Sequence, residues 1–363
     1  MHLFFFLFIL GSLTASVLSI TKGKGDKDEC ATKATTEQAF LTACFRGNNE
    51  RLQELLALSC ANSLLAAKEG VSAGFRFGYT GLIWAAEKNH TKTLRLLLEY
   101  RGAGSTLASY STNNGISALY HAARLGNLDS VNLILSKDPS NVINMPVTYG
   151  EHNGTTPLLA AARNGHTNIV KILLNSGADP HVRLPETGYF PMYFAAKLGD
   201  QEMVKELIRV DSPVNLQTSS GVSALAVATA WGHQQTVDAL LIDQADPNLV
   251  DVFKTSPLHR AAYYGYTNIL KLLIGKGADV NAQNLDGRTA MHFAAIGGHT
   301  ATLRALLPSC PALKTDKNSR TALEAAQLEE LNLSKRKTTS ETSEKLRKLK
   351  EVLNILKGYS PCN

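Results

Sequence analysis

Residues 256–281 read SPLHRAAYYGYTNILKLLIGKGADVN and hold two short helix-forming segments separated by a glycine. Pro257 suits the first turn of a helix, where an N–H group has no intrahelical acceptor, and the serine before it is a good N-cap. Ala261 and Ala262 are small, so that another helix can pack closely against the first segment. Gly265 ends that segment, and a second apolar run then continues to the glycine at 277.

This pattern recurs along most of the chain. The position of Ser256 is filled successively by Gln38, Thr80, Ser117, Thr156, Phe190, Ser223, Ser256, Thr289 and Thr321. From Phe190 onward the copies are 33, 33, 33 and 32 residues apart, and before it the steps are 42, 37, 39 and 34. A unit this short cannot bury its own apolar face, so neighbouring copies must stack.

The T-P-L-H-x-A run and the period near 33 resemble the ankyrin-repeat family. The resemblance covers residues 38–331, and its degenerate first and last copies are typical of terminal caps. It implies an all-α solenoid of about nine stacked helix-turn-helix repeats, with β-hairpin-like fingers along one edge. The longer early steps indicate insertions around residues 59–77, 101–112 and 137–153, which are either tolerated surface loops or part of a binding face.

The remainder of the chain divides around this array. We expect a signal peptide or signal anchor at 1–19, a charged linker at 20–37, the array at 38–331, a basic polar linker at 332–341, and a capping helix and tail at 342–363. The last of these segments is amphipathic, because Leu346, Leu349, Val352, Leu353 and Leu356 share one helical stripe.

The first residues favour export. Residues 3–20 carry no charge and begin with a strongly apolar run, which is typical of a secretory signal cleaved before Ile20. The alternative is an uncleaved membrane anchor, because 18 apolar or small residues can span a bilayer and three lysines follow them. That orientation would leave the repeats in the cytosol. Acceptor triplets for glycosylation at Asn89, Asn153 and Asn332 support secretion weakly, and whether they are modified stays open.

Motifs for catalysis, metal binding or cofactor binding are absent from the sequence, which predicts a protein that is not an enzyme and has no cofactor. The regions outside the array, about 37 and about 32 residues long, are too short for a catalytic domain. The resemblance implies that His259 and His292 brace the turn by hydrogen bonds to backbone. The histidines that follow the inter-helix glycine are also expected to be structural: His90, His166, His233 and His299.

The five cysteines match no zinc-binding spacing. Cys44 and Cys60 fall at packing positions of the repeat, and a buried free cysteine behaves as a small apolar residue. Disulfides between Cys30 and Cys44, between Cys44 and Cys60, or between Cys310 and Cys362 stay open if the chain is exported.

The resemblance implies that a partner protein is held by the fingers and by the exposed ends of the first helices. The candidate binding residues in those slots are Trp231, Phe253, Tyr263, Tyr264, Arg288, Tyr189, Lys197, Arg163, Arg124, Phe75, Phe77 and Tyr79. Trp231, Phe253 and the tyrosine pair should converge on the concave side, because Trp and Tyr are favoured at interface hot spots. The expected partner is an unidentified protein and not a small-molecule substrate. The net charge of +6 is spread along the chain, which argues against nucleic acid. Membrane contact is expected only if the first segment is uncleaved.

Overall fold

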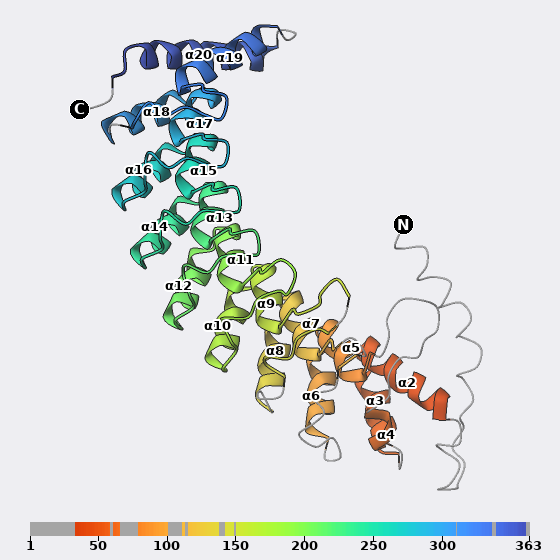
Figure 1. Ribbon diagram of the computed structural model, residues 1–363. Coiled ribbons are helices and arrows are strands. Elements are labelled where there is room, and N and C mark those ends of the chain that lie inside the picture. The colour runs from red at the N-terminus through yellow and green to blue at the C-terminus, as the bar shows by residue number, and fades with distance from the viewer. Residues whose placement is uncertain are drawn as a thin grey trace.

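The computed structural model of the chain describes residues 33–58, 61–65, 79–100, 111–112, 115–137, 142–148, 150–309, 311–335 and 339–360. Within these ranges the regular elements are helices, and they stack in two parallel rows to form an elongated arc (Figure 1). Each helix contacts the corresponding helix of the next repeat, so the core runs continuously along the stack. The prediction of an all-α repeat solenoid is therefore confirmed.

The inner row lies on the hollow side of the arc (Figure 1). It consists of α2 (Lys33–Arg46), α5 (Gly81–Glu87), α7 (Ala118–Leu125), α9 (Pro157–Arg163), α11 (Pro191–Leu198), α13 (Ala224–Ala230), α15 (Pro257–Tyr264), α17 (Ala290–Gly297) and α19 (Ala322–Ser334). The outer row consists of α3 (Asn49–Leu56), α6 (Thr91–Glu99), α8 (Leu128–Leu135), α10 (Thr167–Asn175), α12 (Gln201–Arg209), α14 (Gln234–Ile242), α16 (Thr267–Gly275) and α18 (Thr300–Leu306). The short α4 (Ala61–Leu65) and the 3₁₀ turn η2 (Leu307–Ser309) lie near the two ends, and α20 (Ser340–Lys357) closes the stack.

The loops that precede the inner helices are joined to one another by single backbone hydrogen bonds. Ser219 N–H donates to Thr187 O (3.0 Å), Val252 N–H donates to Ser220 O (3.0 Å), and Leu285 N–H donates to Phe253 O (2.9 Å). Isolated bridges occur inside two of these fingers, and no strand forms in the described residues. Each finger is thus positioned by its neighbour and not by a continuous sheet.

The two histidines of the T-P-L-H run fasten the inner helices to the fingers. The Nδ1 atom of His259 accepts from the backbone N–H (3.1 Å) and hydroxyl (2.8 Å) of the N-cap Ser256. Its Nε2–H donates to the backbone oxygens of Ala282 (3.0 Å) and Arg288 (3.1 Å) in the next finger. His292 repeats this arrangement one repeat later. The predicted structural role of these histidines is confirmed.

These contacts predict a loss of stability in mild acid. Burial lowers the pKa of His259 and His292 below the ordinary 6.5, because removal from water disfavours the charged imidazolium. The unfolded chain binds protons from about pH 6.5 downward, so stability is complete above that pH and falls as the pH drops toward the folded pKa. We expect a loss of up to about 1.4 kcal/mol per histidine for each pH unit, measured by urea unfolding between about pH 7 and about pH 5.5.

The control for this experiment is the double variant His259→Gln and His292→Gln, which should show a weaker pH dependence over the same range. The buried carboxylate of Asp316 does not interfere, because hydrogen bonds from Arg320 and neighbouring backbone hold its pKa at about 2 despite its burial. Equal pH dependence in the wild type and the double variant would contradict the assignment.

The C-terminal helix α20 packs against α17, α18 and α19. Its apolar stripe is buried in that contact, with Leu349, Val352, Leu353 and Leu356 at most 6% exposed. The ammonium of Lys345 pairs with Glu329 on α19 (2.8 Å), and the hydroxyl of Tyr359 donates to the backbone oxygen of Pro311 (2.9 Å). This helix therefore covers the open end of the last repeat.

Several sequence-based expectations concern residues outside the described ranges. These include the signal or anchor segment, Phe75, Phe77, Cys30, Cys60, Cys310 and Cys362. Cys44 is described, and it is a fully buried free thiol whose pKa burial raises to about 12. Of the helices that the structure does describe, none combines the length and apolarity needed to cross a membrane.

Candidate partner-binding surface

The ends of the inner helices form a row that we call the inner ridge. Its residues stand directly before the glycine that ends each helix: Arg124 and Leu125, Arg163 and Asn164, Lys197 and Leu198, Ala230 and Trp231, and Tyr263 and Tyr264. The ridge is basic toward the N-terminal repeats and aromatic toward the C-terminal repeats. Since inner helices contact one another in order, these side chains follow one another along the arc.

The backbone of the ridge is held by side chains of the following repeat. The Nε2–H groups of three post-glycine histidines donate to ridge carbonyls: His166 to Arg124 (3.1 Å), His233 to Lys197 (3.1 Å) and His299 to Tyr263 (2.9 Å). His90 bonds the backbone oxygen of Phe45 in the same way (3.0 Å). The predicted structural role of all four is confirmed, and their contacts fix the ridge against the outer row.

The glycine that ends an inner helix is required, because the ring of the histidine from the following repeat packs directly against it. Gly265 has φ +75°, and a β-carbon there would lie 2.5 Å from Nδ1 of His299. At Gly232, with the same φ, the ring of Tyr266 takes the place of the histidine, 2.8 Å from the position of a β-carbon. Tyr266 thus replaces the histidine at this position of the repeat.

The aromatic end of the ridge is exposed and still ordered by ring contacts. Trp231, Tyr263 and Tyr264 are 57%, 56% and 47% exposed. Tyr263 meets Tyr264 edge to face with centroids 4.9 Å apart, and Tyr264 stacks on Tyr266 at 5.6 Å. Tyr263 also contacts Phe293, a neighbour that the sequence pattern did not single out (5.9 Å). The two tyrosines are therefore brought together as predicted.

Trp231 and Phe253 stand apart from this tyrosine cluster. The ammonium of Lys197 lies 5.9 Å from the centre of the Trp231 ring, at the outer limit of a cation–π contact. Phe253 is 64% exposed on the finger between α14 and α15. In the part of the chain that the structure describes, no ring contact joins either residue to the tyrosines. The four aromatics thus occupy consecutive repeats without forming one closed cluster.

The basic end of the ridge opens onto a pocket of about 160 Å³. Its lining residues come from α7, α9 and the finger between α8 and α9: Tyr120, Arg124, His152, Thr155, Ala160, Arg163 and Asn164. The ring of Tyr120 lies 6.1 Å from that of His152. The pKa of His152 is lowered by burial first and then by the charges of Arg124 and Arg163, against a weaker opposite effect of Glu151.

Three predicted binding residues share the position directly before the N-cap of an inner helix, and this position turns inward. Tyr79, predicted as a partner-binding residue, is only 7% exposed and so offers little surface to a partner. Its hydroxyl is 2.7 Å from Nε2 of His121, and its ring packs at 4.8 Å on that of Trp84. A side chain before the N-cap commonly packs onto the first turns of its helix, which explains this burial.

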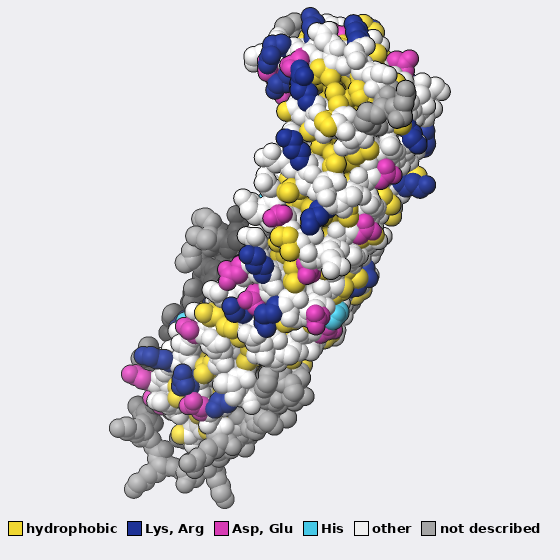
Figure 2. Space-filling model, turned by 90° about the vertical axis from the view of Figure 1, so that its left-hand side faces the viewer, with side chains coloured by type: hydrophobic (Ala, Val, Ile, Leu, Met, Phe, Trp, Pro, Cys, Tyr) yellow, Lys and Arg dark blue, Asp and Glu magenta, His cyan; other side chains and the backbone are white. Residues whose placement is uncertain are grey.

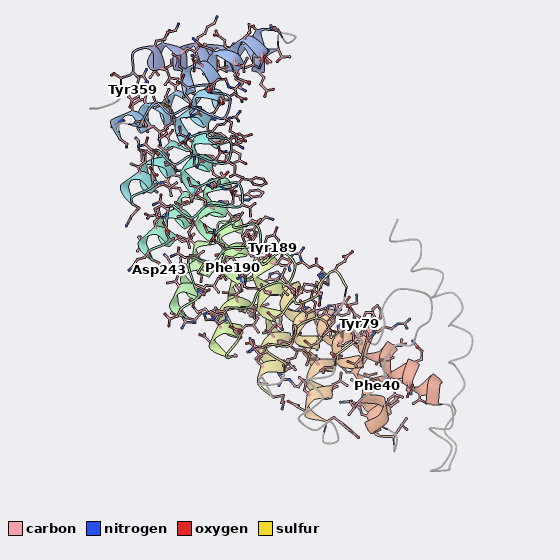
Figure 3. The ribbon with its side chains drawn as sticks, in the orientation of Figure 1. Phe40, Tyr79, Tyr189, Phe190, Asp243 and Tyr359 are labelled. Carbon is pink, nitrogen blue, oxygen red and sulfur yellow. The ribbon has the colours of Figure 1, made fainter. Side chains whose placement is uncertain are left out.

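Tyr189 and Arg288 occupy the same position and are partly buried. Tyr189 stacks on Tyr193 with centroids 4.4 Å apart. Figure 3 shows Tyr189 on the same side of the molecule as Tyr79, whereas Asp243 at the end of α14 lies on the opposite side. Both Tyr189 and Arg288 retain some exposed surface beside the ridge.

The opposite, outer-row side of the molecule has a different surface. Figure 2 shows apolar side chains on this surface, scattered among both basic and acidic ones. Its most exposed large apolar residue is Ile242 at the end of α14, at 68%. Within the described residues, no group of three or more His, Cys, Asp or Glu side chains is placed to hold a metal ion.

A family model for ankyrin repeats, which spans three copies, matches residues 39–145, 107–184, 140–209, 176–251 and 258–334. These matches extend over most of the chain, which therefore belongs to the ankyrin-repeat family. A comparison with curated proteins gave no match. Ankyrin repeats commonly bind protein partners, and the family is generally non-enzymatic.

Proposed function

We propose that this chain is a non-enzymatic scaffold that binds a partner protein along its inner ridge, with the main contact at Trp231, Tyr263 and Tyr264. The observation that supports this best is the exposure of these three rings, each about half exposed and together spanning two successive repeats. Large aromatic side chains dominate interface energetics when a partner covers them, and monomeric proteins seldom leave such groups exposed together.

The contacts beneath the rings strengthen the proposal. Tyr264 is stacked on Tyr266, and the backbone of Tyr263 is bonded to His299, so both tyrosines start from fixed positions. A side chain that is already ordered loses little conformational entropy when a partner binds. The fingers and the partly buried Tyr189 and Arg288 would form the rim of the contact.

Substitution of single ridge aromatics tests the proposal. Partner proteins are captured on the immobilised chain from extracellular and cytosolic fractions, and their affinities are measured for Trp231→Ala and Tyr264→Ala. A hot-spot ring costs about 2 kcal/mol or more when truncated, which is roughly a thirtyfold loss of affinity.

The matched control is Ile242→Ala, which removes an equally exposed apolar side chain from the outer row. It should leave affinity unchanged. Ridge variants that fold normally and bind every captured protein within about threefold of the wild type would reject this surface, because a hot spot costs far more.

We also propose that the chain is exported after cleavage before Ile20, on the strength of its uncharged and apolar first residues. The alternative is a scaffold tethered by residues 3–20, with its repeats in the cytosol. N-terminal sequencing of the native protein separates them, because only the tethered form retains Met1. In either location the partner is a protein and not nucleic acid, since basic and acidic residues are interspersed along the sequence.

A further inference from the structure

The pocket at the basic end of the inner ridge, which we call the basic pocket, holds two cations without counter-charges. Arg124 and Arg163 occupy equivalent positions in adjacent repeats and both line it. Neither guanidinium makes an ion pair or hydrogen bond with any residue that the structure describes, and the buried Nε of Arg124 has no partner. By contrast, two partly buried arginines elsewhere in the described residues have carboxylate partners, Arg260 with Asp251 (2.6 Å) and Arg320 with Asp316 (2.7 Å).

Both positive charges act on the same two side chains of the pocket. Each guanidinium acts on the ionisation of both His152 and Tyr120, so the two charges reach the same pair of rings. Burial keeps Tyr120 protonated and His152 neutral at physiological pH, so the phenol remains a hydrogen-bond donor. Glu151 beside His152 is the acidic residue that acts on the pocket, and it is exposed and does not line it.

The inserted segment before α9 gives the pocket its inner wall. Val147, from this segment, packs with Tyr120 and Ala160 in a small apolar cluster separate from the main core. Thr155 and His152 line the pocket together with the two arginines. The insertion therefore does more than lengthen a loop, since it supplies part of the lining of a pocket that partly buried Arg124 and exposed Arg163 share.

We propose that the basic pocket binds one oxyanion group, a carboxylate or a phosphate, from a side chain of the protein bound along the inner ridge. Arginine is the side chain best suited to such groups, because its planar donors form paired, charge-assisted hydrogen bonds to them. A volume of about 160 Å³ is sufficient for one such group. The assignment of the anion to a partner rests on the proposed function, whereas binding of an oxyanion by the pocket does not.

The test uses inorganic phosphate and acetate as probes on the full chain, at neutral pH and constant ionic strength. Each is titrated to tens of millimolar while the ring NMR signals of His152 and Tyr120 are followed. We expect one saturable site that shifts both rings. Arg124→Gln and Arg163→Gln should each weaken binding about tenfold or more, since each removes charge-assisted hydrogen bonds.

The matched control is Arg95→Gln on the outer helix α6, where the side chain is exposed and pairs only with Glu99 (3.6 Å). It removes the same charge without touching the pocket and should bind as the wild type does. Saturation by phosphate alone would identify the group as a phosphate, and saturation by both probes would extend it to carboxylates. Absence of saturation, or equal weakening by all three substitutions, would overturn the proposal. Because no partner is involved, this result is independent of the ridge-aromatic experiment.

Discussion

Replacing Leu270 with alanine will lower the free energy of unfolding by about 2–5 kcal/mol, because it leaves a cavity at the centre of the stack. The Leu270 side chain on α16 is completely buried. Its helix contacts α14 on one side, α18 on the other and α15 within its own repeat. A loss at this position therefore weakens two repeat interfaces as well as the repeat itself, and stability in such arrays is roughly the sum of these terms.

Leu272→Ala is the matched control, because it makes the same chemical change two residues along the same helix. Leu272 is only partly buried, so its truncation removes less apolar surface and leaves a smaller cavity. Urea unfolding of both variants, followed by circular dichroism, measures the difference. Equal losses would contradict the arrangement of α16, because they would mean that the two leucines are buried alike.

The fold could be predicted because its information is local and repeated. The start of a helix is marked by Pro257, its close packing surface by the paired alanines and its end by Gly265. The same residue types recur at a nearly fixed period. The histidines after the glycine could be recognised for the same reason, since a side chain that recurs in one position serves the common framework. A stack of identical units leaves little choice of topology.

The candidate surface was predicted less completely, because exposure depends on neighbours in space. Tyr79 and Tyr264 are both tyrosines at helix ends, but one precedes an N-cap and turns inward while the other follows the paired alanines and turns outward. The position of Tyr79 directly before an N-cap was the feature of the sequence that could have predicted its burial. The basic pocket was not predictable as a unit, since it combines side chains of α7 and α9 with an inserted segment that follows no repeat pattern.

The repeats carry different exposed side chains on the inner ridge, although the helices beneath them pack in the same way. Along the inner ridge the same two positions hold arginine at α7 and α9, lysine at α11 and aromatic residues at α13 and α15. The same type of histidine contact holds three ridge residues by their backbone oxygens: Arg124, Lys197 and Tyr263. Binding specificity can therefore vary along the ridge without altering the packing beneath it, because the two functions use different atoms of the same residues.

A charge placed under the C-terminal helix should have a large effect that stays local. Leu349 is fully buried where α20 meets the end of the array. Leu349→Arg will put an unpaired charge into that contact, at a cost on the order of 3–5 kcal/mol, and α20 will detach. Hydrogen exchange should then show loss of protection in α20 and weaker protection in α17 and α19, with α5 to α13 unchanged, because each repeat depends mainly on its immediate neighbours.

Asn354→Arg is the control, since it adds the same side chain to the exposed face of the same helix. It should leave protection in α20 intact. If Leu349→Arg also left α20 protected, the helix would not be docked through its apolar stripe. If it unfolded α5 to α13 as well, the array would behave as one cooperative block and not as a stack of nearest neighbours. Either result would change the physical account of how α20 closes the solenoid, whereas a local loss would identify it as a cap that keeps the last repeat from exposing its apolar face.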